Sequence, residues 1–209
     1  MESNIVKALS EVRKAYRLLF DYQSRILDLM SFIERKIQFN FQSGWPLYSE
    51  ASPKPGKIYL DQWSWDWLNM YYYQFYFGEK KTNENTIYFG IVHMADSGFF
   101  ENKNNHDEKI NLKKYKKVEE SKSKLIFVIG YNMWGNWGNI SGNNWNHNDF
   151  TNSSQGHSKN DNGGQMIFKS YDLERFISED SSINTLNDFV MYCEEYNIPF
   201  SIENRTIIN

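Results

Sequence analysis

Residues 4–38 read NIVKALSEVRKAYRLLFDYQSRILDLMSFIERKIQ and contain one regular row of apolar side chains. The members of the row follow one another at alternating steps of four and three residues: Ile5, Leu9, Val12, Tyr16, Leu19, Ile26, Met30, Ile33 and Ile37. Only Gln23 interrupts the row, and neither glycine nor proline occurs before Gly44. This spacing is typical of an amphipathic helix. The sequence therefore predicts one long helix within residues 1–42, roughly 50 Å long at ~1.5 Å per residue.

The apolar row has two interpretations. A second row widens the apolar side beyond a two-stranded seam, and it consists of Leu18, Tyr22, Leu29 and Phe32. In the first interpretation, the helix lies along a sheet or another helix of its own domain. In the second, it forms a seam for self-association or for a protein partner. The pattern alone leaves both interpretations open.

The rest of the chain predicts an antiparallel sheet. Residues 43–57 hold three of the four prolines and are expected to form a linker or crossover loop, with an α+β domain following over residues 58–209. Apolar, β-rich segments predict strands at 72–77, 86–95, 124–132 and 165–170, and the tail after residue 199 is a candidate for a fifth. A helix is expected over 184–196, with Thr185 and Asp188 as its capping box. Because no helices alternate with the strands, the predicted class is α+β: a long N-terminal helix, an antiparallel sheet of about four to five strands, and a C-terminal helix.

Composition and charge exclude several classes of protein. The chain has 209 residues, of which 40% are apolar and 17% aromatic, so it can fold around a sizeable core. Its net charge of -3 gives no general attraction to nucleic acid or acidic lipid, and no apolar run is long enough to span a membrane. Cys193 is the single cysteine and the N-terminus lacks a secretory signal pattern, which together indicate a cytoplasmic protein. No cofactor is expected, because no phosphate-binding loop or other cofactor motif is present.

Residues 132–164 are rich in Asn, Gly and Trp and are expected to form a long loop between two strands. Indole rings can stack on sugar rings or bases, and Asn amides can hydrogen-bond hydroxyls or base edges. The candidate ligand-binding residues of this loop are Trp134, Trp137, Asn144 and Trp145. In the alternative interpretation, the tryptophans anchor the loop on the domain while Asn and Gly form its turns.

The same loop contains four residues of types that bind metals: His147, Asp149, His157 and Asp161. Two imidazoles and two carboxylates could hold a divalent ion that activates water for hydrolysis. Their spacing matches no established metal motif, so polar loop residues in water are the simpler interpretation. Outside the loop, His93 and Cys193 are expected to be structural residues of a strand and a helix.

Residues 109–124 carry seven lysines around Tyr115. The lysines could neutralise phosphates and Tyr115 could stack on a base, which makes nucleic acid a conceivable partner. However, Glu119 and Glu120 interrupt the block, and it contains no arginine, the usual reader of base edges. A solvated connection between strands is the simpler interpretation.

Taken together, these features predict a non-enzymatic binding or regulatory protein that acts through protein–protein contacts, with the N-terminal helix as the contact surface. The Asn- and Lys-rich composition is typical of AT-rich bacterial or phage genomes, which makes an inhibitor or accessory factor of a defence system a candidate role. Two alternatives stay open. One is a metal-dependent hydrolase or nuclease that uses the loop His and Asp residues, and the other is a glycan- or nucleotide-binding module that uses the loop tryptophans.

Overall fold

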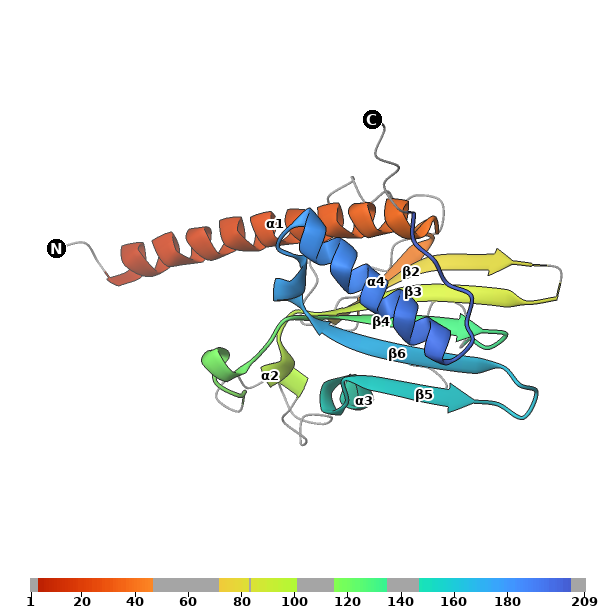
Figure 1. Ribbon diagram of the computed structural model, residues 1–209. Coiled ribbons are helices and arrows are strands. Elements are labelled where there is room, and N and C mark those ends of the chain that lie inside the picture. The colour runs from red at the N-terminus through yellow and green to blue at the C-terminus, as the bar shows by residue number, and fades with distance from the viewer. Residues whose placement is uncertain (1–3, 47–71, 83, 101–114, 135–146, 204–209) are drawn as a thin grey trace, which may run out of the picture.

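The computed structural model describes residues 4–46, 72–82, 84–100, 115–134 and 147–203, which form one sheet flanked by helices (Figure 1). The helices are α1 (Asn4–Ile37), α2 (Ser97–Phe100), η3 (Val118–Glu120), α3 (His147–Asn152), η4 (Leu173–Phe176) and α4 (Glu179–Glu195). The strands are β1 (Ser43–Pro46), β2 (Tyr72–Lys81), β3 (Thr86–Met94), β4 (Lys124–Tyr131), β5 (Gln155–Lys159) and β6 (Gln165–Asp172). The strand order is β1-β2-β3-β4-β6-β5, and every neighbouring pair is antiparallel. The predicted α+β class is confirmed, with six strands in place of four or five.

The predicted N-terminal helix is confirmed as the single helix α1. It ends at Ile37 because Gln38 adopts a left-handed backbone conformation with φ 57°. The Glu34 carboxylate accepts a hydrogen bond from the backbone N–H of Phe41 at 2.7 Å, which holds the returning chain against the last turn of the helix. Among the described helices, α1 included, none combines the length and apolarity that crossing a membrane requires.

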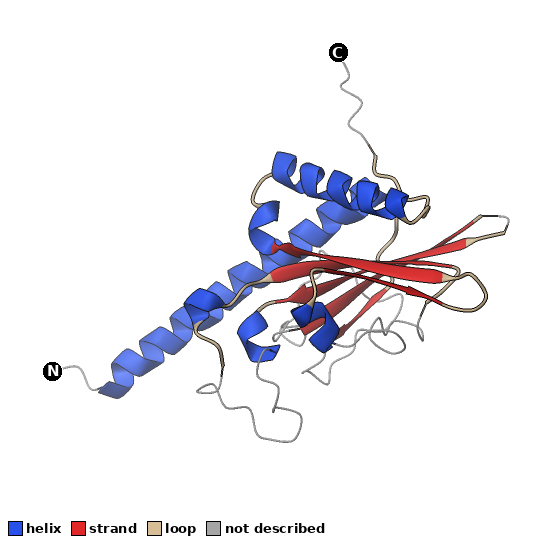
Figure 2. Ribbon diagram, turned by 60° about the horizontal axis from the view of Figure 1, so that its bottom comes forward, coloured by secondary structure: helices blue, strands red, loops and turns tan. Residues whose placement is uncertain are grey.

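The two long helices cover the same face of the sheet, and the short helices α2 and α3 lie on the other (Figure 2). Side chains alternate between the faces along each strand. On β3, Phe89 and Ile91 alternate in this way with Gly90 and Val92. Both faces are buried along the central strands, which explains why β3 and β4 read as nearly continuous apolar runs.

Phe89 lies at the centre of the larger core, between the sheet and the two long helices. Its ring centroid lies within 6.1 Å of five other phenylalanine rings, which come from β2, β4, α4 and the segments after α1 and α4: Phe39, Phe77, Phe127, Phe189 and Phe200. Tilted, edge-on and offset arrangements of this kind are the favoured geometries for aromatic pairs. This aromatic cluster joins segments that are far apart in the chain.

Four local predictions differ from the described structure. The expected linker over 43–57 begins with a strand, because Ser43–Pro46 pairs with β2 along the sheet edge. The expected loop over 132–164 is not continuous, since it contains α3 and the strand β5. The C-terminal helix begins at Glu179, five residues earlier than expected, and its capping box is made by Ser178 and Ser181 in place of Thr185 and Asp188. The tail forms no strand in its described residues 201–203.

We expect Phe89→Ala to lower the free energy of unfolding by about 3–5 kcal/mol, because it leaves a cavity at the meeting point of five other rings. Urea denaturation followed by circular dichroism measures this difference. Ile177→Ala, at a position that is 82% exposed, is the control and should change stability by less than about 0.5 kcal/mol. A similar small effect for both variants would contradict this description of the core.

Candidate functional site

The apolar row of α1 changes its environment along the helix. From Ile26 to Ile37 its members are buried against the sheet. Nearer the N-terminus the row is exposed, with exposed fractions of 67% for Ile5, 51% for Leu9, 49% for Val12, 54% for Tyr16 and 41% for Leu19. These five residues form what we call the projecting stripe. Figures 1 and 2 show that this half of α1 extends beyond the sheet.

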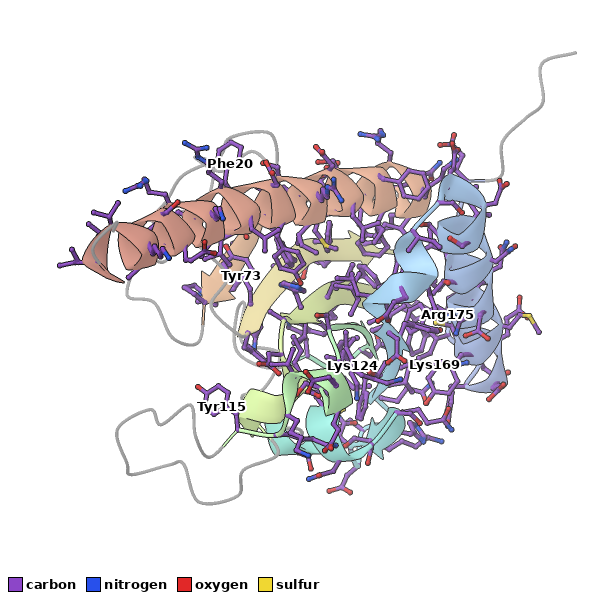
Figure 3. All side chains as sticks on the ribbon, turned by 90° about the vertical axis from the view of Figure 1, so that its left-hand side faces the viewer. Phe20, Tyr73, Tyr115, Lys124, Lys169 and Arg175 are labelled. Carbon is purple, nitrogen blue, oxygen red and sulfur yellow. The ribbon has the colours of Figure 1, made fainter. Side chains whose placement is uncertain are left out.

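The sides of the projecting half are polar. Lys14 forms an ion pair with Glu11 at 2.8 Å, and both side chains are well exposed. An apolar hollow of about 340 Å³ lies beside the helix, lined by Tyr16, Arg17, Phe20 and Asp21. Phe20 points away from the sheet (Figure 3). The projecting half is therefore amphipathic in its own right, although the described sheet does not cover its apolar side.

Buried polar side chains mark the point where α1 meets the sheet. The Tyr22 hydroxyl lies 2.8 Å from Nε2 of His93, a fully buried residue of β3. Burial lowers the pKa of His93 to about 4, so the imidazole is neutral at pH 7. Burial likewise raises the pKa of the Tyr22 hydroxyl. Tyr73, opposite His93 in the β2–β3 pairing, lies between α1 and the sheet (Figure 3). The prediction that His93 belongs to the interior of a strand agrees with this geometry.

A second candidate site is a hollow of about 470 Å³ beside Trp134, on the opposite face of the sheet. It is lined by Tyr76, Glu79, Tyr88, Asn132, Met133, Trp134 and Asn160. The indole of Trp134 stacks on the ring of Tyr88, with centroids 5.6 Å apart and planes 16° apart, and also contacts Tyr76 at 5.7 Å. Burial, with the nearby Glu79 carboxylate, raises the pKa of Tyr76 to about 12, so its hydroxyl stays neutral. The hollow thus combines aromatic rings with one carboxylate and two side-chain amides.

Glycine at position 130 makes this arrangement possible. A Cβ atom there would lie 2.0 Å from the Met133 carbonyl oxygen and 2.8 Å from the Trp134 ring, both closer than atoms can approach. The chain also reverses at Asn132, whose left-handed backbone has φ 53°. The Asn132 side-chain oxygen accepts a hydrogen bond from the Thr86 N–H at 2.8 Å, which fixes the turn to β3. Trp134 is therefore held on the sheet by its neighbours in sequence.

The structure places the other predicted ligand-binding residues as follows. Trp137, Asn144 and Trp145 lie outside the described residues. Tyr115 packs, like Trp134, against the smaller apolar cluster, but it precedes β4 while Trp134 follows it, so the two residues lie at opposite ends of that strand. Tyr115 lies on the side of the sheet away from α1 (Figure 3). The described geometry therefore assigns Trp134, but not Tyr115, to the hollow.

The predicted metal ligands are not brought together in the described residues. The side chain of His147 lies outside them, and Asp149 and Asp161 lie at opposite ends of β5. His157 projects from β5, where its Nε2 lies 3.1 Å from the Gln165 side-chain oxygen. Within the described ranges, no group of three or more His, Cys, Asp or Glu residues could hold a metal ion. The metal site stays a prediction without support from this part of the chain.

Sequence reasoning missed a half-buried polar cluster between β6 and α4. Lys169 forms an ion pair with Asp188 at 2.8 Å, and the Tyr171 hydroxyl donates to the same carboxylate at 2.7 Å. Burial alone raises the pKa of Asp188, but the hydrogen bonds from Lys169 and Tyr171 outweigh it and lower the pKa. Arg175 stacks over the Tyr171 ring at 5.0 Å (Figure 3). The one signal in the sequence is Lys169 itself, a charge within an apolar strand.

The fold and these surfaces define an α+β protein with one long, partly exposed helix. The chain belongs to the PM0109 family, whose model matches residues 2–197. That match includes the projecting half of α1, the sheet and α4. Searches of curated proteins and of solved structures found no match to the chain.

We expect the stability difference between the wild type and His93→Gln to depend on pH. An unfolded histidine binds a proton below about pH 6.5, whereas folded His93 stays neutral down to about pH 4. Lowering the pH from 7 to 4.5 therefore destabilises the wild type through this residue, and the gap to His93→Gln should shrink by about 2–3 kcal/mol. Urea denaturation at both pH values measures the gap. Val92→Ala, a buried neighbour on the same strand that has no titratable group, is the control, and its gap should stay constant. A constant gap for His93→Gln would contradict a neutral, buried imidazole.

Proposed function

We propose that this protein is a binding or regulatory protein that acts through protein–protein contacts made by the projecting stripe of α1. The observation that carries the proposal is the exposure of Ile5, Leu9, Val12 and Leu19 in one row on a helix whose other half is buried. Monomeric proteins seldom expose contiguous apolar patches of this kind unless the patch is a contact surface. Anchors at steps of three and four residues are also the pattern by which one helix docks into a groove or against another helix.

The physical cost of leaving apolar side chains of this half in contact with water supports the same proposal. Most of the stability of a helix in water comes from burial of its apolar face, because intrinsic propensity contributes little per residue. The projecting half contains the β-branched residues Ile5, Val6 and Val12, which are less favourable in helices than alanine or leucine. A partner would bury these side chains and stabilise the helix at the same time. Through such a contact the protein would either inhibit its partner or act as an accessory factor to it.

A matched pair of variants tests the proposal. Leu9 and Leu18 are both exposed leucines of α1. Leu18 belongs to the second apolar row, but nine residues at ~100° each place it on the side of the helix opposite Leu9, so it does not widen the stripe at this level. We expect tagged wild-type protein and Leu18→Ser to retain the same partner from a lysate of the encoding organism, and Leu9→Ser to lose it. With the purified partner, Leu9→Ser should bind at least about tenfold more weakly, as for a central anchor. Equal binding by the two variants would rule out the stripe as the contact surface.

The hollow beside Trp134 favours a second candidate function, the binding of a glycan or nucleotide. Here an aromatic surface lies beside the Glu79 carboxylate and the Asn160 amide, and sugars and bases are bound by aromatic rings with polar groups of this kind at their edge. The Asn132 amide is already engaged by Thr86 and Asn85 and shapes the hollow. We expect titration with sugars and nucleotides to shift tryptophan fluorescence in a saturable way and Trp134→Phe to weaken the response. Trp45→Phe, on β1 and outside the hollow, is the control. A flat response across both ligand classes would dispose of this function.

A further inference from the structure

The apolar row of α1 lies in two different environments. In residues 26–37 it faces the protein's own sheet, and in residues 5–19 it forms the projecting stripe. We propose that the stripe is covered by the stripe of a second copy of this chain, with the two α1 helices antiparallel across a two-fold axis. This inference rests on the proposed function, because it names the partner of the same surface. A two-fold dimer uses one self-complementary patch on each copy, and the stripe is such a patch.

The position of the sheet selects the antiparallel arrangement. We call the sheet together with α4 the body of the protein. The body lies on the side of α1 toward which the row points, and it packs against the C-terminal half of that helix (Figure 1). In a parallel pair, both bodies would lie on the seam at the same end and would collide. In an antiparallel pair, the two bodies lie at opposite ends of the seam, each close to the N-terminal end of the other helix. The exposed halves can then pack along their whole length without contact between the two sheets.

The spacing of the row also selects a register. Antiparallel helices pack in layers, and the register that uses the stripe from end to end sets Leu9 against Leu19 and Val12 against Tyr16 of the other copy. In this register Ile5 reaches the level of Gln23, where the helix becomes buried by its own sheet. The two-fold axis passes near residue 14. Ala8 and Ala15 border the seam on one side, and their small side chains allow the helices to approach closely.

The exposed area is sufficient for a dimer. The exposed fractions of Ile5, Val6, Leu9, Val12 and Leu19 lie between 41% and 67%. With roughly 150–200 Å² of surface for a residue of this size, these five side chains present roughly 450 Å² of apolar area per chain. Burying this area on both copies would remove roughly 900 Å² of apolar surface from water, which lies in the size range of weak, transient interfaces.

Light scattering after size-exclusion chromatography tests self-association of the full-length chain. We expect a dimer at about 100 µM that dissociates on dilution toward about 1 µM, as for an association of micromolar affinity. Leu9→Glu places a carboxylate in both leucine layers, so its dissociation constant should rise at least tenfold, whereas Leu18→Glu on the opposite side should leave the dimer intact. Unchanged circular dichroism in the absence of denaturant establishes that both variants fold. A wild type that is monomeric throughout, or equal dimerisation of the two variants, would overturn the proposal.

Cysteine crosslinking tests the orientation, because the native Cys193 is buried. Ala15→Cys lies near the proposed two-fold axis, so the antiparallel pair should form an intermolecular disulfide. Leu9→Cys lies about 15 Å along the helix from its copy in the antiparallel pair and should not crosslink, whereas a parallel pair would place the two cysteines in one layer. Efficient crosslinking through Leu9→Cys, or none through Ala15→Cys in a dimeric sample, would overturn the antiparallel arrangement.

The outcomes separate this inference from the proposed function. A monomer that binds a different protein through Leu9 but not Leu18 would end the self-association proposal and leave the protein-binding proposal standing. A monomer without any Leu9-dependent partner would end both. A monomer without a Leu9-dependent partner would also result if another part of the same chain covered the stripe. In that case the backbone of residues 5–19 would be protected from hydrogen exchange in the monomer.

Discussion

The packing of residues 26–37 of α1 on the apolar face of the sheet closes the larger core and sets the direction of the whole helix. Ile26, Met30 and Ile33 are buried there together with Phe89 and the aromatic rings around it. A sheet face of this composition cannot remain in contact with water, and α4 alone does not cover it. Because α1 is one uninterrupted helix, fixing its second half also fixes the direction of its first half. The projecting stripe is therefore held in one orientation relative to the body.

The sequence was most informative where a pattern extended over many residues. The row in α1 spans nine turns of helix at ~3.6 residues per turn, so a single polar member such as Gln23 could not obscure it. The four longer strands were found because apolar and β-branched residues make up both of their faces. The row did not reveal that its members have two environments. Ile5 and Ile33 look equivalent in sequence, and the difference arises only from where the sheet ends.

The missed elements are those whose stability comes from a neighbour. β1 has four residues, includes Gly44 and Pro46, and exists because it pairs with β2. β5 reads QGHSK, without an apolar face, and is held by its pairing with β6. Similarly, Ser178 caps α4 although Thr185 lies closer to its apolar row, because the helix extends into a polar first turn. Residue types alone carry little information about such tertiary pairing.

The candidate sites also differ in how far the sequence alone could predict them. Trp134 could be selected from sequence, since a tryptophan in a segment rich in Asn and Gly needs a packing partner. Its actual partners, Tyr76 and Tyr88, come from other strands. Trp134 can reach them only because Gly130 has no side chain, since a Cβ atom there would collide with the indole ring. The Lys169–Asp188 pair joins residues of β6 and α4 that no spacing rule connects. For the same reason, the mere presence of His157 and Asp161 in one segment did not predict where their side chains would point.

The two outer strands have a consequence for how copies of this protein meet. Open sheet edges offer unpaired backbone groups to any passing strand, which is the usual route to fibrils and disordered aggregates. β1 is short and ends in Pro46, which has no N–H to donate, and β5 is polar, with Lys159 at its end. Edge-to-edge growth of the sheet is disfavoured at both ends. Contacts between copies are therefore directed away from the two sheet edges and toward other surfaces, of which the projecting stripe is the most apolar one described.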